Sequence, residues 1–86
     1  MFYVYIIKSK KDSKLYTGST NDLKQRFKEH NDGKVKSTKS RIPFELIYYE
    51  AYISEKDARV REHNLKLRAN ALNQLKKRIK NSLLIY

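Results

Sequence analysis

The 86-residue sequence contains no cysteine, so neither disulfide bonds nor a zinc site built on thiolates can hold its fold together. Its two histidines, His30 and His63, are too few for a closed zinc site. The apolar run at residues 2–7 is too short to span a membrane or to act as a signal peptide, and lysine follows it directly. A chain of this length leaves no room for a second domain. We therefore expect one cytoplasmic domain covering residues 1–86.

Acidic residues are scarce. Nine Asp and Glu residues stand against 20 Lys and Arg residues, which gives a formal net charge of +11 at pH 7. This imbalance favours a polyanionic partner, nucleic acid first and an anionic membrane second. Seven tyrosines add surfaces on which bases can stack, although we assign Tyr48, Tyr49 and Tyr52 to the core, with their hydroxyls at its edge. The composition thus predicts a nucleic-acid-binding protein, with DNA as the first candidate.

Residues 15–30 (LYTGSTNDLKQRFKEH) predict a short strand, a glycine turn at Gly18 and a helix that begins near Asn21. The candidate N-cap residues are Thr20, Asn21 and Asp22. His30 falls on the apolar face of this helix, and Arg26 lies one turn before it. A tyrosine, an arginine and a histidine are therefore carried by one compact unit, which would hold them in fixed relative positions as a functional site requires.

Hydrophobic periodicity predicts three strands and three helices in the order ββαβαα, an α+β fold. The strands cover residues 2–7, 15–17 and 44–53, and the helices cover about 21–30, 54–69 and 70–83. The first strand is apolar throughout, as is typical of a strand covered on both faces. Gly33 is placed to end the first helix in a left-handed conformation, and Pro43 fits the start of the third strand.

The second predicted helix carries an acid among its apolar residues. Its narrow apolar stripe consists of Ala58, Leu65 and Ala69. Glu62 lies within the same arc. A carboxylate on an inward-facing stripe is unfavourable unless it is paired or binds a metal ion. An ion pair with Arg59 or Lys66 explains Glu62 as well as a functional site does.

The segment 34–43 contains basic residues and no acid. They are Lys34, Lys36, Lys39 and Arg41. A solvated loop is the simplest interpretation of such a run. Because the run directly follows the helix that bears His30, we assign it instead to binding the phosphates of nucleic acid.

In order and spacing, these motifs resemble the GIY-YIG nuclease domain, specifically its small stand-alone bacterial members, over nearly the whole chain. Residues 3–5 (YVY) correspond to the first motif and residues 16–18 (YTG) to the second. The family's helix arginine falls on Arg26, the histidine of the small members on His30, and the metal-binding glutamate on Glu62. Ser19 stands where excinuclease relatives carry a lysine. The candidates for a further asparagine that many members use are Asn70 and Asn73.

The resemblance implies a three-stranded antiparallel sheet flanked by helices, and an endonuclease that hydrolyses phosphodiester bonds in DNA with one Mg²⁺, for which Mn²⁺ can substitute. It also suggests a role in DNA repair, recombination or processing. Glu62 would bind the metal, and Tyr16, with Tyr5 beside it, would orient or deprotonate the attacking water. Arg26 would hold the charge that develops on the phosphate. His30 would contact the phosphate or assist proton transfer, unless it is a core histidine whose hydrogen bonds are satisfied.

Two other classes of protein fit the same residues. One is a nucleic-acid-binding module that keeps the fold and the basic surface without catalysis. The other is a nuclease subunit that is active only with a protein partner, or as a homodimer. The sequence leaves open which nucleic acid is cut: duplex, single-stranded, branched or damaged DNA, or RNA.

Overall fold

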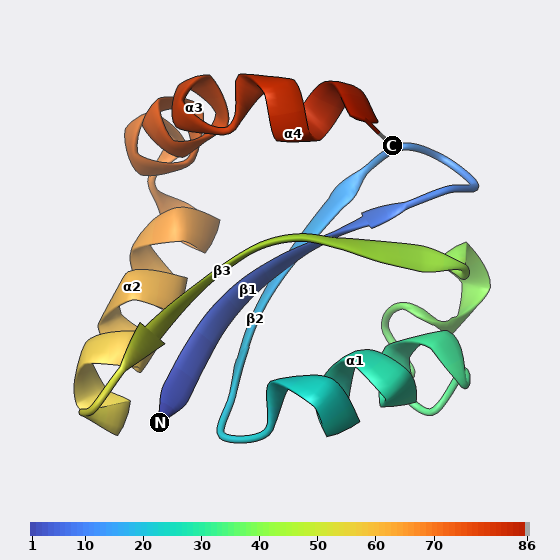
Figure 1. Cartoon of the computed structure of the whole chain (residues 1–86), viewed down its shortest axis with the longest axis horizontal. Helices are drawn as coiled ribbons and strands as arrows, with labels where there is room; N and C mark the ends of the chain where they lie inside the picture. Colours follow the sequence, from blue (N-terminus) through green and yellow to red (C-terminus); the bar gives the residue numbers. More distant parts are fainter. Residues whose placement is uncertain (86) are drawn as a thin grey trace.

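The computed structural model describes residues 1–85. The elements are β1 (Phe2–Ser9), β2 (Leu15–Thr20), α1 (Leu23–Asn31), a short 3-10 turn η1 (Lys39–Arg41), β3 (Phe44–Tyr52), α2 (Glu55–Leu67), α3 (Ala69–Arg78) and α4 (Lys80–Ile85). The strands form one antiparallel sheet in the order β2-β1-β3. The α1 helix lies on one side of the sheet, and α2, α3 and α4 lie on the other (Figure 1). The predicted α+β fold with a three-stranded antiparallel sheet is confirmed.

The central strand β1 is the core of the molecule. Its residues 4–7 are at most 1% exposed. Val4 and Ile6 pack against Leu65 of α2 and its neighbours, whereas Tyr5 and Ile7 face the α1 side. Because β1 pairs with β2 on one edge and β3 on the other, both its faces and both its edges are covered. This is why the apolar run continues without alternation.

The ends of α1 follow local sequence signals. Asp22 caps the first turn, because its side chain accepts a hydrogen bond from the Gln25 amide at 3.1 Å. At the other end Gly33 has φ +75°, and the amides of Gly33 and Lys34 bond back to the carbonyls of His30 and Glu29. This is the glycine-terminated Schellman arrangement that the sequence predicts. The helix begins at Leu23, two residues later than expected.

The C-terminal helices differ from the prediction. The second helix ends at Leu67 because Arg68 adopts an extended conformation, so Ala69 opens α3 and is exposed instead of continuing the apolar stripe. The expected helix over 70–83 is broken at Ile79 into α3 and α4. After this break α4 reaches β1, where the Lys8 ammonium donates to the Leu83 carbonyl at 2.9 Å.

A charged cluster ties α2 to the sheet. The Glu50 carboxylate on β3 accepts hydrogen bonds from Tyr48 at 2.6 Å and from Tyr52, and it pairs with the Arg61 guanidinium at 3.0 Å. Burial works to raise the pKa of Glu50, but these hydrogen bonds outweigh it and the pKa lies below its usual range. Tyr48 and Tyr52 thus pack as expected, with their hydroxyls at the edge of the core, whereas Tyr49 is 55% exposed, against the prediction.

His30 is a polar residue in the core, and it is 0% exposed. Its Nε2 lies 2.7 Å from the Tyr5 hydroxyl and its Nδ1 lies 2.9 Å from the Thr38 hydroxyl. The Thr38 hydroxyl donates to the Val35 carbonyl, so its oxygen accepts from Nδ1–H and leaves Nε2 to accept from Tyr5. Burial, with a further contribution from the charge of Arg26, lowers the pKa of His30 to about 4.

Glu50→Gln should destabilise the fold by roughly 1–3 kcal/mol, because it leaves the half-buried Arg61 without a counter-charge. Glu55→Gln is the matched control, since Glu55 forms only an exposed pair with Arg59 and its loss should change stability by less than about 1 kcal/mol. Urea unfolding of both variants measures the difference. Equal losses would show that the cluster does not hold α2 to the sheet.

The free energy of unfolding should fall as the pH drops from 6.5 to about 5. In this range His30 binds a proton in the unfolded chain but stays neutral in the folded chain. A histidine whose folded pKa is depressed contributes its full stability above the unfolded pKa and loses it on acidification, at up to about 1.4 kcal/mol per pH unit. Denaturant unfolding against pH measures the slope. His63→Gln, at an exposed histidine, should keep this slope; its loss in that variant would contradict the assignment to His30.

Candidate active site

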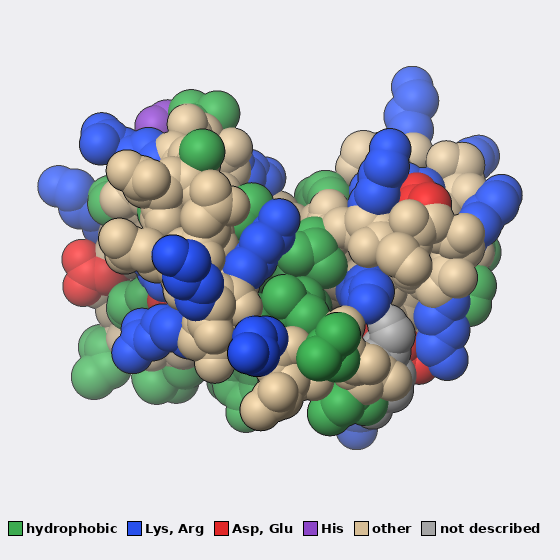
Figure 2. Space-filling model, turned by 90° about the horizontal axis from the view of Figure 1, so that it is seen from above, with side chains coloured by type: hydrophobic (Ala, Val, Ile, Leu, Met, Phe, Trp, Pro, Cys, Tyr) green, Lys and Arg blue, Asp and Glu red, His purple; other side chains and the backbone are tan. Residues whose placement is uncertain are grey.

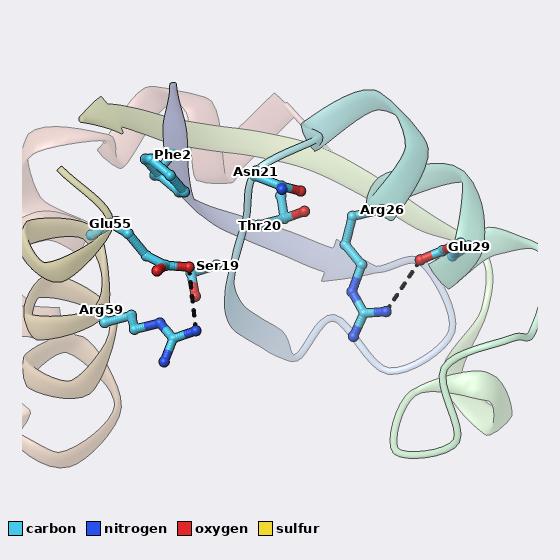
Figure 3. A pocket seen from close by; sticks show the side chains of 9 residues that line it. Phe2, Ser19, Thr20, Asn21, Arg26, Glu29, Glu55 and Arg59 are labelled. Atoms are coloured by element: carbon cyan, nitrogen blue, oxygen red, sulfur yellow. Dashed lines mark hydrogen bonds and ion pairs between the residues drawn. The ribbon is translucent and has the colours of Figure 1, made fainter. Parts of the chain in front are cut away.

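A polar cleft lies at the edge of the sheet, where the end of β2 meets α1 and α2. It has a volume of about 390 Å³. Figure 3 shows Ser19 and Thr20 in its middle, with Arg26 and Glu29 of α1 on one side and Glu55 and Arg59 of α2 on the other. Each arginine pairs with the acid of its own helix, Arg26 with Glu29 at 3.2 Å and Arg59 with Glu55 at 3.3 Å. The Arg59–Glu55 pair is exposed and the Arg26–Glu29 pair is partly exposed, so an incoming anion can reach both arginines and exchange for either carboxylate.

The position of the Tyr5 ring, next to this cleft, depends on the absence of a side chain at Gly18. Gly18 is paired with Tyr5 inside β2, not in the turn that the sequence suggested. A Cβ on Gly18 would overlap the Tyr5 ring, at 2.6 Å from its Cζ atom. Glycine is therefore required here for the close approach of the ring to the β2 backbone.

Arg26 connects Tyr5 to the cleft. Burial works to lower the pKa of Arg26, but its interactions with Glu29 and with the Tyr5 hydroxyl outweigh it and raise the pKa. Burial raises the pKa of Tyr5 to about 12, against the effect of Arg26. Tyr5 is therefore a neutral phenol near pH 7, which donates its hydroxyl proton to His30 Nε2.

Glu62 of α2 lies in a second cleft of about 380 Å³, which shares Ser19 and Arg59 with the first. The Ser19 hydroxyl donates to Glu62 Oε1 at 2.6 Å, and the Lys66 ammonium lies 2.8 Å from Oε2. Burial works to raise the pKa of Glu62, but Lys66 and Ser19 outweigh it and hold the pKa below its usual range. Glu62 is thus an ionised carboxylate that remains 21% exposed.

Tyr16 joins the two parts of the site. Its ring packs edge-on against the His30 ring, with centroids 5.1 Å apart, and the Lys66 ammonium lies 5.6 Å from the Tyr16 ring centroid. Tyr5 also packs edge-on against His30, at 5.7 Å. The structure thus places Tyr5 and Tyr16 against the His30 imidazole. Neither tyrosine lines either cleft, whereas Arg26 lines the first cleft and Glu62 the second.

Within residues 1–85, no three His, Cys, Asp or Glu side chains cluster closely enough to enclose a metal ion. A site for Mg²⁺ needs less, because this ion keeps several waters and binds through one or two carboxylates together with substrate phosphate oxygens. Glu62 is ionised and open to a cleft, and Ser19 orients one of its oxygens. These residues fit a single-carboxylate Mg²⁺ site and do not fit a closed zinc site.

Other predicted site residues lie elsewhere. His30 is buried and lines neither cleft. Lys34, Lys36 and Lys39 are exposed in the segment after α1. Arg41 pairs with Asp12 at 3.0 Å and its guanidinium lies 5.6 Å from the Phe44 ring centroid. Among the charged side chains on the face seen in Figure 2, basic ones are far more common than acidic ones.

The sequence did not identify the side chains that hold Glu62 and His30. Glu62 is held by Ser19 and Lys66, and His30 by Thr38. Ser19 directly follows the second motif, at the position where excinuclease relatives carry a lysine, and that substitution was the available signal. Lys66 was one of two alternatives for pairing with Glu62, and the structure selects it over Arg59. No sequence signal points to Thr38. The asparagine candidates Asn70 and Asn73 are exposed on α3 and line neither cleft.

Comparison with known proteins gives consistent matches. Residues 1–81 match the GIY-YIG catalytic domain family. A UPF0213 protein of Clostridium perfringens is 46% identical over 67 residues, which cover 77% of this chain and 71% of that protein. A UPF0213 protein of Haloquadratum walsbyi is 42% identical over 65 residues, 74% of this chain and 72% of that protein.

A solved structure of another UPF0213 protein agrees with these sequence matches. The solution NMR structure of a UPF0213 protein from Bacillus halodurans is 39% identical, covers 90% of this chain and 84% of that chain, and superposes with a TM-score of 0.56. The match over residues 1–81 takes in both tyrosine motifs, Arg26, His30 and Glu62. This chain therefore belongs to the GIY-YIG family, with small UPF0213 proteins among its relatives.

Proposed function

We propose that this protein is an endonuclease that hydrolyses phosphodiester bonds in DNA with one divalent ion, Mg²⁺ or Mn²⁺, held at Glu62. The observation that carries the proposal is the pair of adjoining clefts at the β2 edge. The ionised Glu62 carboxylate opens into one cleft and the Arg26 guanidinium lines the other. Membership of a nuclease family supports the same reaction. A role in cytoplasmic DNA repair, recombination or processing is part of the proposal.

Each side chain has a stated task. A bound Mg²⁺ would polarise the scissile phosphate and stabilise the leaving oxygen. Arg26 donates its planar set of N–H groups to the charge that develops on phosphorus, in place of its exposed bond to Glu29. Tyr16 orients the attacking water with its hydroxyl and, once its own proton has passed to solvent, receives the proton of that water. Tyr5 remains protonated and fixes the orientation of Arg26.

His30 has an indirect task in this mechanism. Its burial and its bonds to Tyr5 and Thr38 place it behind the reacting groups. It is a positioning residue that holds the Tyr5 hydroxyl proton, so that the oxygen of Tyr5 faces Arg26. The exposed residues Lys34, Lys36 and Lys39 would bind phosphates beyond the scissile bond, and Arg41 would join them only by leaving Asp12.

Glu62→Gln should abolish cleavage of labelled DNA in Mg²⁺, by at least about 100-fold, because the amide removes the only charge offered to the metal. DNA binding, followed by fluorescence anisotropy, should change little because the basic surface is intact. Glu55→Gln makes the same charge change in the adjoining cleft and should retain cleavage. Full activity of Glu62→Gln, or cleavage by the parent protein in EDTA, would refute the assigned site.

Arg26→Ala should reduce the cleavage rate by about 10²–10³-fold, the effect typical of removing a donor to transition-state charge. Arg26→Lys should recover little, because a point charge does not reproduce the planar donor geometry. Lys24→Ala, at an exposed position on the same helix, removes the same charge and serves as the control. Equal losses of cleavage rate in Arg26→Ala and Lys24→Ala would show that Arg26 acts only through its net charge. Single-turnover assays on single-stranded, duplex and flap DNA would make the comparison.

A further inference from the structure

Lys66 occupies the place where a cation would approach Glu62. Its ammonium lies 2.8 Å from Oε2, and the other carboxylate oxygen already accepts from Ser19. Both oxygens of the proposed metal ligand are therefore engaged within the chain. A divalent ion at Oε2 would be brought against a positive charge at close range, which is unfavourable unless the ammonium moves.

The lysine is able to move. Its side chain is 43% exposed, on a flexible stem one helical turn after Glu62. The carboxylate is 21% exposed, and the pair joins residues one helical turn apart. Pairs at this spacing on a helix contribute little to stability, so breaking this one requires little free energy. The ammonium also lies beside the Tyr16 ring, so a small displacement leaves it next to the groups proposed to act on the phosphate.

The other cation near Glu62 is held differently. Arg59 lines the same cleft, but its guanidinium pairs with Glu55 at 3.3 Å. Its charge acts on Glu62 only at longer range. Lys66 and Arg59 carry the same charge, but only Lys66 is in direct contact with the Glu62 carboxylate. This difference can be tested.

We propose that Lys66 is a counter-ion switch: it neutralises Glu62 while the clefts are free of substrate and moves to a nucleic-acid phosphate when a divalent ion takes the carboxylate. The inference rests on the proposed function, since it assumes that Glu62 binds the metal. Its consequence is that metal and nucleic acid bind cooperatively, because the phosphate removes the cation that competes with the metal. By linkage, each ligand raises the affinity for the other by the same factor.

The first test measures Mn²⁺ binding to the folded protein without nucleic acid, by titration calorimetry or by the electron paramagnetic resonance of free Mn²⁺. Lys66→Met and Lys66→Gln should bind Mn²⁺ about two- to fivefold more tightly than the parent protein. Lys77→Met, at an exposed position on α3, makes the same change in net charge and should leave the affinity unchanged. Glu62→Gln defines the binding that does not depend on the carboxylate.

The second test measures cooperativity in a Tyr16→Phe background, intended to prevent cleavage. Mn²⁺ should raise the affinity for a short fluorescein-labelled oligodeoxynucleotide, and Lys66→Met should reduce that enhancement. Thermal unfolding of each variant verifies that the fold is retained, and Lys66→Gln replaces Lys66→Met if the latter unfolds.

The outcomes separate the two proposals. Mn²⁺ binding that needs Glu62 but does not respond to Lys66 would overturn the switch and leave the metal site intact. Binding that does not need Glu62 would overturn both. Equal tightening in Lys66→Met and Lys77→Met would also overturn the switch, because net charge would then explain the effect.

Discussion

The close approach of the Tyr5 ring to the backbone of Gly18 is the contact on which the arrangement of the site depends. It places the Tyr5 hydroxyl within reach of His30 from α1, and His30 in turn bonds Thr38 in the segment that follows. One buried chain of hydrogen bonds thus joins β1, the first helix and the segment before β3, and the Tyr5 ring at its start packs on β2. Because every buried member of the chain has a partner, its polar groups fix positions within the core instead of weakening it.

A second set of contacts brings the glutamate to this centre. Glu50 and Arg61 hold α2 to β3, while Ser19 and Glu62 hold the same helix to β2 on the opposite edge of the sheet. The α2 helix therefore spans the sheet, and its orientation determines where the Glu62 carboxylate lies. Stability and the proposed chemistry share this helix, since the contacts that hold it also aim its carboxylate.

The polar groups of the site are of two kinds, buried ones with fixed partners and accessible ones whose partners can change. His30 is sealed in the core with a neutral ring, so its partners are fixed. Arg26 and Glu62 are ion-paired within the chain, but their pairs are open to the clefts. Ion pairs that reach water are weak and exchange readily, which under the proposed function allows Arg26 and Glu62 to stay paired without ligand and still bind a phosphate or a metal ion.

Local signals in the sequence were sufficient for much of the fold. The apolar run of β1, the Asp22 cap and the left-handed Gly33 are each decided by a few neighbouring residues, and the structure has all three. The periodicity did not show the extended Arg68 or the break at Ile79, because packing of α3 and α4 against distant strands decides them. It placed Gly18 in a turn because the reason for glycine there is a ring on another strand.

The same division holds for the site. The sequence by itself singled out Tyr16, Arg26 and Glu62 as candidates for the proposed chemistry, through their resemblance to the motifs of the family. Only the tertiary structure decided their surroundings: Ser19, which binds Glu62, is 43 residues away, and the burial of His30 comes from groups on four other segments. Residue identity is local, whereas burial, pairing and pKa depend on what the fold brings within a few ångströms.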